Sequence, residues 1–259
     1  MKLINNGNTC YINTILQFLL QSRSFANDLN KINIPKNTLL YELRNIRLIK
    51  EKKDIINPIK FINTLENKLN ENLNHQYDAQ EILIKIIDEF EKENKTITNK
   101  YFHGEKRNTL TCTNCKNKRI NFENFTCIQL YNLVGSISKS INDYFKSEQI
   151  DSVFCEKCNK NTKTIKKMKI INFPMFLIFQ FMRYNTVNEI IPSNKLCFYK
   201  ENTYGLKCII NHYGNLNSGH YTFLCQRKGE LIEISDTDIS NVSKICPRAI
   251  YLVLYSSIK

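Results

Sequence analysis

The stretch Gly7-Asn8-Thr9-Cys10-Tyr11-Ile12-Asn13-Thr14-Ile15-Leu16-Gln17 decides how the rest of the chain is interpreted. Apolar residues recur at positions 12, 15, 16, 19 and 20, which is the period of an amphipathic helix. Asn8 is a residue type that caps helices, so we expect Cys10 to lie in the first helical turn. The positive end of the helix dipole would then favour a nucleophilic thiolate. A lone cysteine is more often a buried structural residue, so other residues must support a catalytic role.

The composition favours one large folded domain with a diffusely basic surface. Of the 259 residues, 42% are hydrophobic, and there are only seven Gly and five Pro, which argues against long linkers. The net charge of +13 suggests an acidic partner or nucleic acid. The basic residues are spread along the chain and mixed with acids, however, and no basic stripe with interleaved aromatics occurs. We therefore do not expect nucleic-acid binding.

The cysteines and the apolar segments indicate a reducing compartment. If the chain begins natively at Met1, the Cys10 segment follows too soon to leave room for a signal peptide. The longest apolar run, residues 170–182, is interrupted by polar residues and a Pro and is too short to span a bilayer. Four of the ten Cys form two CxxC pairs, which is typical of metal binding rather than of secreted disulfides. We expect a cytoplasmic or nuclear monomer without membrane contact.

The two CxxC pairs, Cys112–Cys115 and Cys155–Cys158, supply four soft ligands. Each pair can hold a tetrahedral ion from a tight turn, and the 39 residues between Cys115 and Cys155 mean that the ion would join two separate hairpins. Four thiolates leave no open coordination position, so we predict a structural Zn²⁺ rather than a catalytic one. Chance pairing or disulfide formation is the alternative.

The remaining pattern divides the chain into a helical first part and a strand-rich remainder. Helical spacing covers residues 39–53 and 58–73 and resumes after Asp78, and the polar segment 91–100 marks the boundary. Asp78 and Glu81 are three residues apart, so both carboxylates project from one side of a helix start, either for binding or as solvated acids. We expect strands at residues 165–171, 176–181, 206–211, 221–225, 230–234 and 249–255.

His220 follows Gly219 at the start of a predicted strand and is one of only four His. A Cys at a helix N-terminus, a His after a flexible loop, and an acid 16 residues later, Asp236, form the set that a thiol protease needs. His220 would take the proton of Cys10, and a third side chain would orient the imidazole. A single His is more often structural, and the sequence alone does not show that these residues meet.

Taken in order, the motifs of the chain resemble those of the ubiquitin-specific proteases, which are papain-like cysteine deubiquitinases. The resemblance covers nearly the whole chain. Each motif is weak alone, but their number and order make the match specific. The motifs are NNGNTCYINTILQ (residues 5–17), QYDAQEIL (76–83), Phe102-His103-Gly104 with the two CxxC pairs, FPMFLIFQFMR (173–183), HYGNLNSGHY (212–221) and AIYLVLY (249–255).

The resemblance implies a role for each matching residue. Cys10 would be the nucleophile, His220 the general base and Asn5 the side chain of the oxyanion hole. Asp78 and Glu81 would bind the basic C-terminal tail of ubiquitin. The other residues expected at the substrate are Gln76, His212, Tyr221 and Gly219, whose missing side chain would let a Gly-Gly tail pass, together with a moving loop at 215–218.

The chain departs from the family pattern at the third member of the triad. Ser235 stands where the family usually has an acid, and Asp236 matches its second acid. We rank Asp236 first and Ser235 second as the partner of His220, because a carboxylate stabilises an imidazolium by its charge and a hydroxyl does not. Leu231 replaces the usual Trp, and Ile82 replaces the usual Phe, which is a harmless change.

From the resemblance we expect an α+β papain-like fold with a helical thumb (residues 1–95), zinc-tied β fingers (96–165) and a β palm (166–259). The expected reaction is hydrolysis of the bond after the terminal Gly of ubiquitin, through an acyl-enzyme. Three alternatives stay open: a catalytically weak relative that binds ubiquitin, a protease for another ubiquitin-like modifier, and a zinc-dependent nucleic-acid module.

Overall fold

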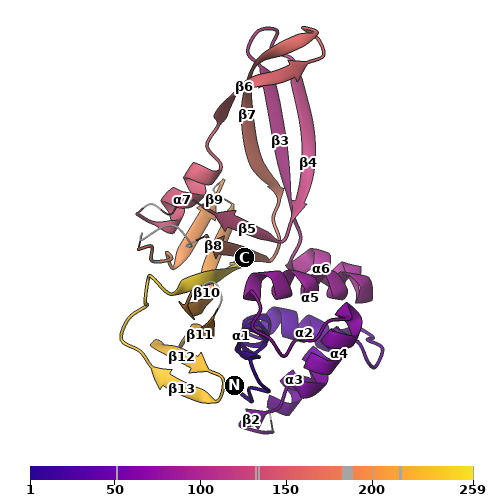
Figure 1. Cartoon of the computed structure of the whole chain (residues 1–259), viewed down its shortest axis with the longest axis vertical. Helices are drawn as coiled ribbons and strands as arrows, with labels where there is room; N and C mark the ends of the chain where they lie inside the picture. Colours follow the sequence, from indigo (N-terminus) through magenta and orange to yellow (C-terminus); the bar gives the residue numbers. More distant parts are fainter. Residues whose placement is uncertain are drawn as a thin grey trace.

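The computed structural model describes residues 1–50, 52–131, 133, 135–182, 189–199, 201–215 and 218–258. Helices from the first part of the chain gather beside a large sheet, and a four-stranded sheet extends away from both (Figure 1). This arrangement confirms the α+β fold class. Arg183 of the motif 173–183, and positions 216 and 217 of the loop expected to move, lie outside the described residues. Within the described ranges, no helix is both long and apolar enough to cross a bilayer.

The helical part is built around α1, in which every residue from Cys10 to Leu19 is buried. Its apolar side chains lie in a core shared with the neighbouring helices and with one face of the large sheet. Since a helix that is buried on all sides needs neighbours on all sides, α1 fixes the elements around it. The other helices of this part are α2 (Arg23–Lys31), α3 (Leu39–Lys50), α4 (Ile59–Leu69), α5 (Ala79–Glu93) and α6 (Lys95–Tyr101).

The start of α1 differs from the sequence prediction in its cap. Asn8 does not cap the helix: its backbone is left-handed (φ 52°), and its side chain donates to the carbonyl of Asn74 at 3.3 Å. Thr9 occupies the cap position, and its N–H donates to the side-chain oxygen of Asn5 at 3.1 Å. Cys10 is nevertheless the first residue of the helix, so its predicted place in the first turn is confirmed.

The polar segment 91–100 is helical rather than an irregular boundary. α5 continues to Glu93, and Asn94 then caps α6 by accepting the N–H of Ile97 at 3.0 Å. A polar composition does not prevent a helix here, because a capping residue restarts the helical hydrogen bonds. In contrast, α3 stops at Lys50, short of the predicted residue 53.

The four-stranded sheet has the order β4-β3-β7-β6 and is antiparallel throughout. Its strand β7 (Lys160–Asn172) stays paired with β3 (Gly104–Cys112) up to its last residue, so the expected boundary at residue 165 falls inside the sheet. The hairpin ends carry the two CxxC pairs to the far end of this sheet (Figure 1). The outer strands are β4 (Lys118–Phe125) and β6 (Glu148–Cys155).

The large sheet has the order β13-β12-β11-β10-β14-β8-β5, with β9 paired to β10. One face packs on the helices, and the other face, with α7 (Ile137–Tyr144), forms a second core. β8 (Phe176–Phe181) is buried over its whole length between the two cores, and its bounds are those predicted. The remaining strands are β5 (Cys127–Leu130), β9 (Lys195–Phe198), β10 (Asn202–Gly214), β11 (Gly219–Arg227), β12 (Glu230–Ser235), β13 (Asp238–Asn241) and β14 (Ile250–Ser257).

A short parallel pair, β1 (Lys2–Leu3) and β2 (Ile55–Ile56), ties the start of the chain to the helical part. The N–H of Leu3 also donates to the carbonyl of Asp236 at 3.0 Å, which links the same segment to the large sheet. The residues between Leu3 and Cys10 are therefore held at the junction of the two parts.

Candidate active site

Cys10 lies where α1 meets β11, and the residue is only 5% exposed. The backbone N–H of Tyr221 donates to its sulfur. Burial raises the pKa of the Cys10 thiol above its usual value, and the nearby Asp236 carboxylate adds to the rise. Burial and the Asp236 carboxylate thus oppose the thiolate that the helix dipole is expected to favour. A base must take the proton before this sulfur can attack a carbonyl.

His220 directly precedes Tyr221, the residue whose N–H reaches the sulfur of Cys10. The Nε2 atom of His220 lies 2.8 Å from the Oγ atom of Ser235. The structure thus pairs the imidazole with Ser235, which the sequence analysis ranks second, and not with Asp236, which it ranks first. A hydroxyl can fix the orientation of the ring, but it brings no charge to an imidazolium.

Asp236 instead joins the large sheet to the segment before Cys10. Its Oδ2 atom accepts from Nδ2 of Asn5 at 2.9 Å, and its Oδ1 atom accepts from Nδ2 of Asn13 at 2.7 Å. The backbone of Asp236 is left-handed (φ 52°) in the turn that follows β12, so its side chain leaves the regular alternation of the strand. This turn is the physical reason why Asp236 contacts two amides and Ser235 contacts the imidazole.

The amide of Asn5 is held on both sides. Its oxygen accepts the backbone N–H groups of Gly7 and Thr9, each at 3.1 Å, and its nitrogen donates to Asp236. An amide nitrogen carries two N–H bonds, so fixing the direction of one fixes the direction of the other. The side chain predicted for the oxyanion hole is therefore oriented in the free protein, beside the start of the Cys10 helix.

A narrow cavity of about 80 Å³ lies beside Cys10, between the helical part and the large sheet. Gln76 bridges it: its Oε1 atom accepts the N–H of Gly219 at 3.0 Å and so joins the loop before α5 to the β10–β11 hairpin. Six of the predicted site residues line the cavity, whereas Glu81 lies at the exposed start of α5, paired with Lys85 at 3.2 Å. The lining residues are Cys10, Tyr11, Gln76, Tyr77, Asp78, His212, Asn215, Ser218, Gly219 and Tyr221.

Gly219 has a reason to be glycine that differs from the one the resemblance implies. A Cβ atom on Gly219 would lie 2.2 Å from Nε2 of His212 and 2.7 Å from the carbonyl oxygen of Tyr213. The ring of His212 also packs on that of Tyr221, with centroids 4.5 Å apart, and burial lowers the pKa of His212. The direction that a Cβ atom of Gly219 would take is therefore occupied by the His212 ring, while Gly219 itself lines the cavity.

Asp78 carries structural bonds in addition to its position on the cavity. As the cap of α5, its Oδ1 atom accepts the N–H groups of Gln80 at 2.7 Å and Glu81 at 3.1 Å. Its Oδ2 atom accepts the hydroxyl of Tyr251 on β14. The carboxylate is thus fixed between the helical part and the large sheet.

Tyr251 and Gln180 are not among the site residues predicted from the sequence, yet both support Asp78. The Nε2 atom of Gln180 on β8 donates to the Tyr251 hydroxyl at 2.6 Å. The Oε1 atom of Gln180 accepts from Gln129 on β5 at 2.9 Å. A single polar residue in a strand that is otherwise apolar is a signal that could have pointed to Gln180, because buried polar groups need partners.

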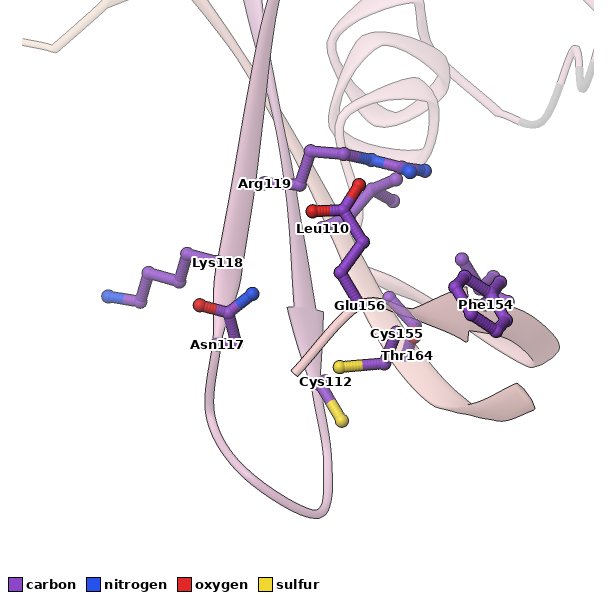
Figure 2. Close-up of a pocket in the computed structure, with 10 residues that line it drawn as sticks. Leu110, Cys112, Asn117, Lys118, Arg119, Phe154, Cys155, Glu156 and Thr164 are labelled. Atoms are coloured by element: carbon purple, nitrogen blue, oxygen red, sulfur yellow. The ribbon is translucent and has the colours of Figure 1, made fainter. Parts of the chain in front are cut away.

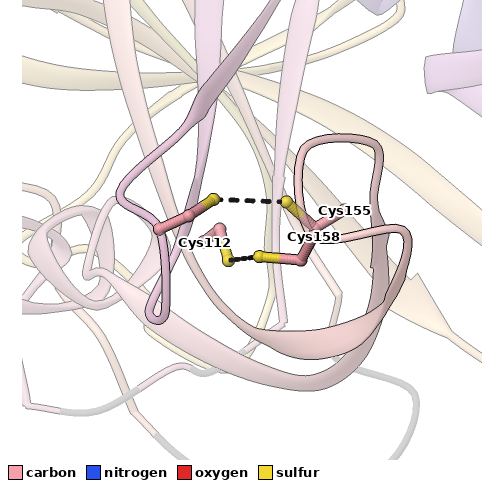
Figure 3. Close-up of side chains that lie close together, drawn as sticks. Cys112, Cys155 and Cys158 are labelled. Atoms are coloured by element: carbon pink, nitrogen blue, oxygen red, sulfur yellow. Dashed lines mark hydrogen bonds between the residues drawn. The ribbon is translucent and has the colours of Figure 1, made fainter.

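The two CxxC pairs meet at the far end of the four-stranded sheet, as Figure 3 shows. Their sulfur atoms all lie within 4.8 Å of one another. The sulfurs of Cys112 and Cys158 are 3.9 Å apart, and those of Cys115 and Cys155 are 3.5 Å apart, with all four cysteines free. The prediction that these four side chains form one cluster is confirmed.

Two of the sulfur–sulfur distances in the cluster are close to those of a tetrahedral metal site. Metal–sulfur bonds of about 2.3 Å place the sulfurs roughly 3.8 Å apart, and the two measured distances lie on either side of that value. A pocket of about 130 Å³ adjoins the cluster, and Arg119 and Glu156 are among the residues that line it (Figure 2). Among the residues that the structure describes, this pocket shares none with the cavity beside Cys10. The cluster can therefore bind a metal away from the candidate active site.

Residues 1–255 match the family model described as ubiquitin carboxyl-terminal hydrolase. The chain belongs to this family. The match to this hydrolase family covers the helical part, the four-stranded sheet and the large sheet together.

Curated members of the hydrolase family are distant in sequence. Ubiquitin carboxyl-terminal hydrolase 26 of Arabidopsis thaliana is 26% identical over 283 residues, which cover 93% of this chain and 26% of that protein. Probable ubiquitin carboxyl-terminal hydrolase R319 of Acanthamoeba polyphaga mimivirus is 27% identical over 187 residues, 60% of this chain and 40% of that protein. The chain thus spans between about a quarter and two fifths of the length of these relatives.

A solved structure shares the fold. The structure of the SAGA Ubp8/Sgf11/Sus1/Sgf73 DUB module bound to ubiquitin aldehyde matches 100% of this chain and 69% of the compared chain, with a TM-score of 0.81 and 21% identity. This likeness confirms the fold of the hydrolase family for all parts of the chain.

Proposed function

We propose that the chain is a cysteine-type ubiquitinyl hydrolase that cuts the peptide or isopeptide bond after the C-terminal Gly of ubiquitin. The observation that carries the proposal is the arrangement around Cys10. Its sulfur accepts the N–H of Tyr221, and the preceding residue, His220, has its ring against Ser235. Membership of the hydrolase family supports the reaction, and the ubiquitin aldehyde of the similar structure supports the substrate.

The first chemical step would be attack by Cys10. The imidazole of His220 takes the thiol proton, and the thiolate adds to the carbonyl carbon of the terminal Gly, so that a C–S bond forms and negative charge moves to oxygen. The Asn5 amide and the backbone N–H of Cys10 would stabilise this oxyanion. Ser235 would orient the ring and Asp236 the amide, so two adjacent residues would divide the positioning between them.

The second step would release the leaving amine and then the acyl group. The intermediate collapses, the C–N bond breaks, and the amine takes the proton from the imidazolium of His220. A thioester remains on Cys10. His220 then removes a proton from water, the hydroxide oxygen adds to the thioester carbonyl, and the C–S bond breaks. The free thiol and the ubiquitin carboxylate are the products.

The narrow cavity suits an extended peptide tail with small residues at its end. Asp78 and Glu81, at the start of α5, are the acids that would attract the basic side chains of this tail on a chain whose net charge is +13. Gln76, His212 and Tyr221 would border its path. The helical part would then act as a thumb, the four-stranded sheet as fingers and the large sheet as a palm for the globular part of ubiquitin.

The cysteine cluster would hold a structural Zn²⁺. Four thiolates complete a tetrahedral shell and leave no position for a substrate or water. The ion would lock two hairpin ends together, and would take no part in hydrolysis.

The test is intact-mass measurement after the protein is mixed with ubiquitin that carries a C-terminal thiol-reactive electrophile. We expect one adduct, which is lost in Cys10→Ala and kept in Cys246→Ala, since Cys246 is an exposed cysteine outside the cavity. Binding without an adduct would contradict hydrolysis. It would favour the second candidate, a catalytically weak relative that binds ubiquitin. The uncharged partner of His220, Ser235, supports this candidate. If the protein reacts only with another ubiquitin-like modifier, that modifier is the substrate and the proposed mechanism is unchanged.

A further inference from the structure

Glu233 on β12 gathers hydrogen bonds from three residues of the neighbouring strands. Its Oε1 atom accepts from Oγ1 of Thr222 at 2.6 Å, from the hydroxyl of Tyr213 at 3.0 Å and from Nδ2 of Asn211 at 3.2 Å. Thr222 belongs to β11, and the other two donors belong to β10. One carboxylate oxygen therefore links three adjacent strands of the large sheet. Glu233 has no role in the proposed mechanism.

The register of these strands places the cluster on the sheet face of His220. Tyr213 stands directly opposite His220 in the β10–β11 pair, and Asn211 stands opposite Thr222. Side chains that face each other across an antiparallel pair, or that lie two residues apart on one strand, share a face. Since its hydroxyl reaches β12, the side chain of Tyr213 must cross β11 beside His220.

Glu233 also lies close to the partner of the imidazole. Ser235 is two residues further along β12, so the two side chains point to the same face of the sheet. Thr222, which bonds Glu233, is likewise two residues beyond His220 on β11. The Thr222 side chain thus lies between the Glu233 carboxylate and the contact of His220 with Ser235.

We propose that Glu233 is a positioning residue for His220: through Tyr213 and Thr222 it fixes the side chains that flank the imidazole, and it brings to this face the negative charge that Ser235 lacks. The inference rests on the proposed hydrolase function, in which His220 is the base.

The charges around His220 come from several elements. Tyr213 stays an uncharged donor over the working range, because burial together with Glu233 raises its pKa to about 12. Asp236 already accepts two amide groups. The elements packed around His220 carry these titratable groups: Cys10 on α1, His212 and Tyr213 on β10, Glu233 on β12 and Asp236 in the turn that follows it.

The test compares Glu233→Gln with Glu230→Gln. Glutamine keeps the size and an acceptor oxygen but removes the charge. Glu230 lies on the same strand, at its far end from Ser235, and accepts from Asn241 at 3.4 Å. We expect Glu233→Gln to lower kcat for a fluorogenic ubiquitin amide about threefold with KM unchanged, because a neutral acceptor makes weaker hydrogen bonds than a carboxylate. The NMR signals of the His220 ring should shift in the free protein, which reports the position of the ring without any turnover, and Glu230→Gln should change neither kcat nor these signals.

Tyr213→Phe provides a second variant that keeps the charge. It removes one donor to Glu233, so we expect kcat to fall about threefold with KM unchanged, as for loss of a modest hydrogen bond. Unchanged His220 ring signals in folded Glu233→Gln, or an unchanged kcat in Tyr213→Phe, would overturn the inference. If the wild type fails to cleave ubiquitin while Glu233→Gln still shifts these signals, the proposed function fails and the placement of Glu233 beside His220 stands.

Discussion

The cysteine cluster and the cavity beside Cys10 are built in opposite ways. At the cluster, four identical ligands come from two short turns, and each turn closes through a left-handed residue, Lys116 or Asn159. At the cavity, the contacts join distant segments: the bond between Asn5 and Asp236 links residues 231 positions apart. A site made of local turns tolerates small shifts in the fold, whereas a site assembled from distant segments depends on each bond that joins them.

This difference separates stability from chemistry. The cluster fastens the end of the four-stranded sheet, at a place that shares no described residue with the cavity. In the cavity, the bond from Gly219 to Gln76 sets the distance between the helical part and the sheet. Changes at the cluster should therefore alter folding first, and changes at the cavity should alter turnover or substrate binding first.

Cys112→Ser should have the largest effect. Loss of one thiolate weakens metal binding, and the folding free energy that the metal supplies is lost with it, on the order of 5 kcal/mol. Elemental analysis should show the loss of zinc, and thermal unfolding should show the loss of stability. The matched control is Cys197→Ser, which removes an exposed cysteine on β9 and should change neither. Wild-type protein that is folded and active without zinc would contradict the structural role of the cysteine cluster.

Asp236→Ala and Ser235→Ala should differ in turnover although the residues are neighbours. Without Asp236 the Asn5 amide loses its orienting acceptor, and loss of an oxyanion donor costs about 10²- to 10³-fold in kcat. Without the Ser235 hydroxyl, the His220 ring loses one hydrogen bond, and we expect a loss of roughly tenfold, the equivalent of about 1.4 kcal/mol. Steady-state hydrolysis of a fluorogenic ubiquitin amide measures both. A greater loss from Ser235→Ala would mean that orienting the imidazole matters more than orienting the amide.

The two sites also differ in how far the sequence predicts them. The four cluster ligands follow from CxxC spacing, because each turn is local. The partner of His220 does not follow, because it depends on the left-handed turn at Asp236 and on pairing between distant strands. Asn8 fails as the cap of α1 for the same kind of reason: the oxygen of Asn5, held by Asp236, takes the N–H of Thr9.

Regular elements show the same contrast between local pattern and tertiary context. The sequence predicts β8 with its correct bounds, since a strand that is buried on both faces is a continuous apolar run. It does not identify α7, in which only Ile137, Ser140 and Ile141 are buried. A short helix with so few apolar residues is stabilised by packing on the sheet. Its sequence has little apolar periodicity from which a helix could be predicted.

Tyr251→Phe should have the smallest effect, and it asks whether the bonds behind Asp78 matter for the substrate. The variant removes the hydroxyl that lies between Gln180 and Asp78, so the carboxylate keeps its place as a helix cap but loses its second anchor. We expect KM for the ubiquitin substrate to rise about threefold at constant kcat, and the free energy of unfolding to fall by about 1 kcal/mol.

Tyr255→Phe is the matched control for Tyr251→Phe. Tyr255 is a buried tyrosine on the same strand whose hydroxyl donates to the carbonyl of Ser193 at 2.7 Å and whose ring lies in the other core. It should lose similar stability with KM unchanged. Equal KM values in the two variants would reduce Asp78 to a helix cap, whereas a fall in kcat in Tyr251→Phe alone would extend the role of Asp78 from substrate binding to the chemical step.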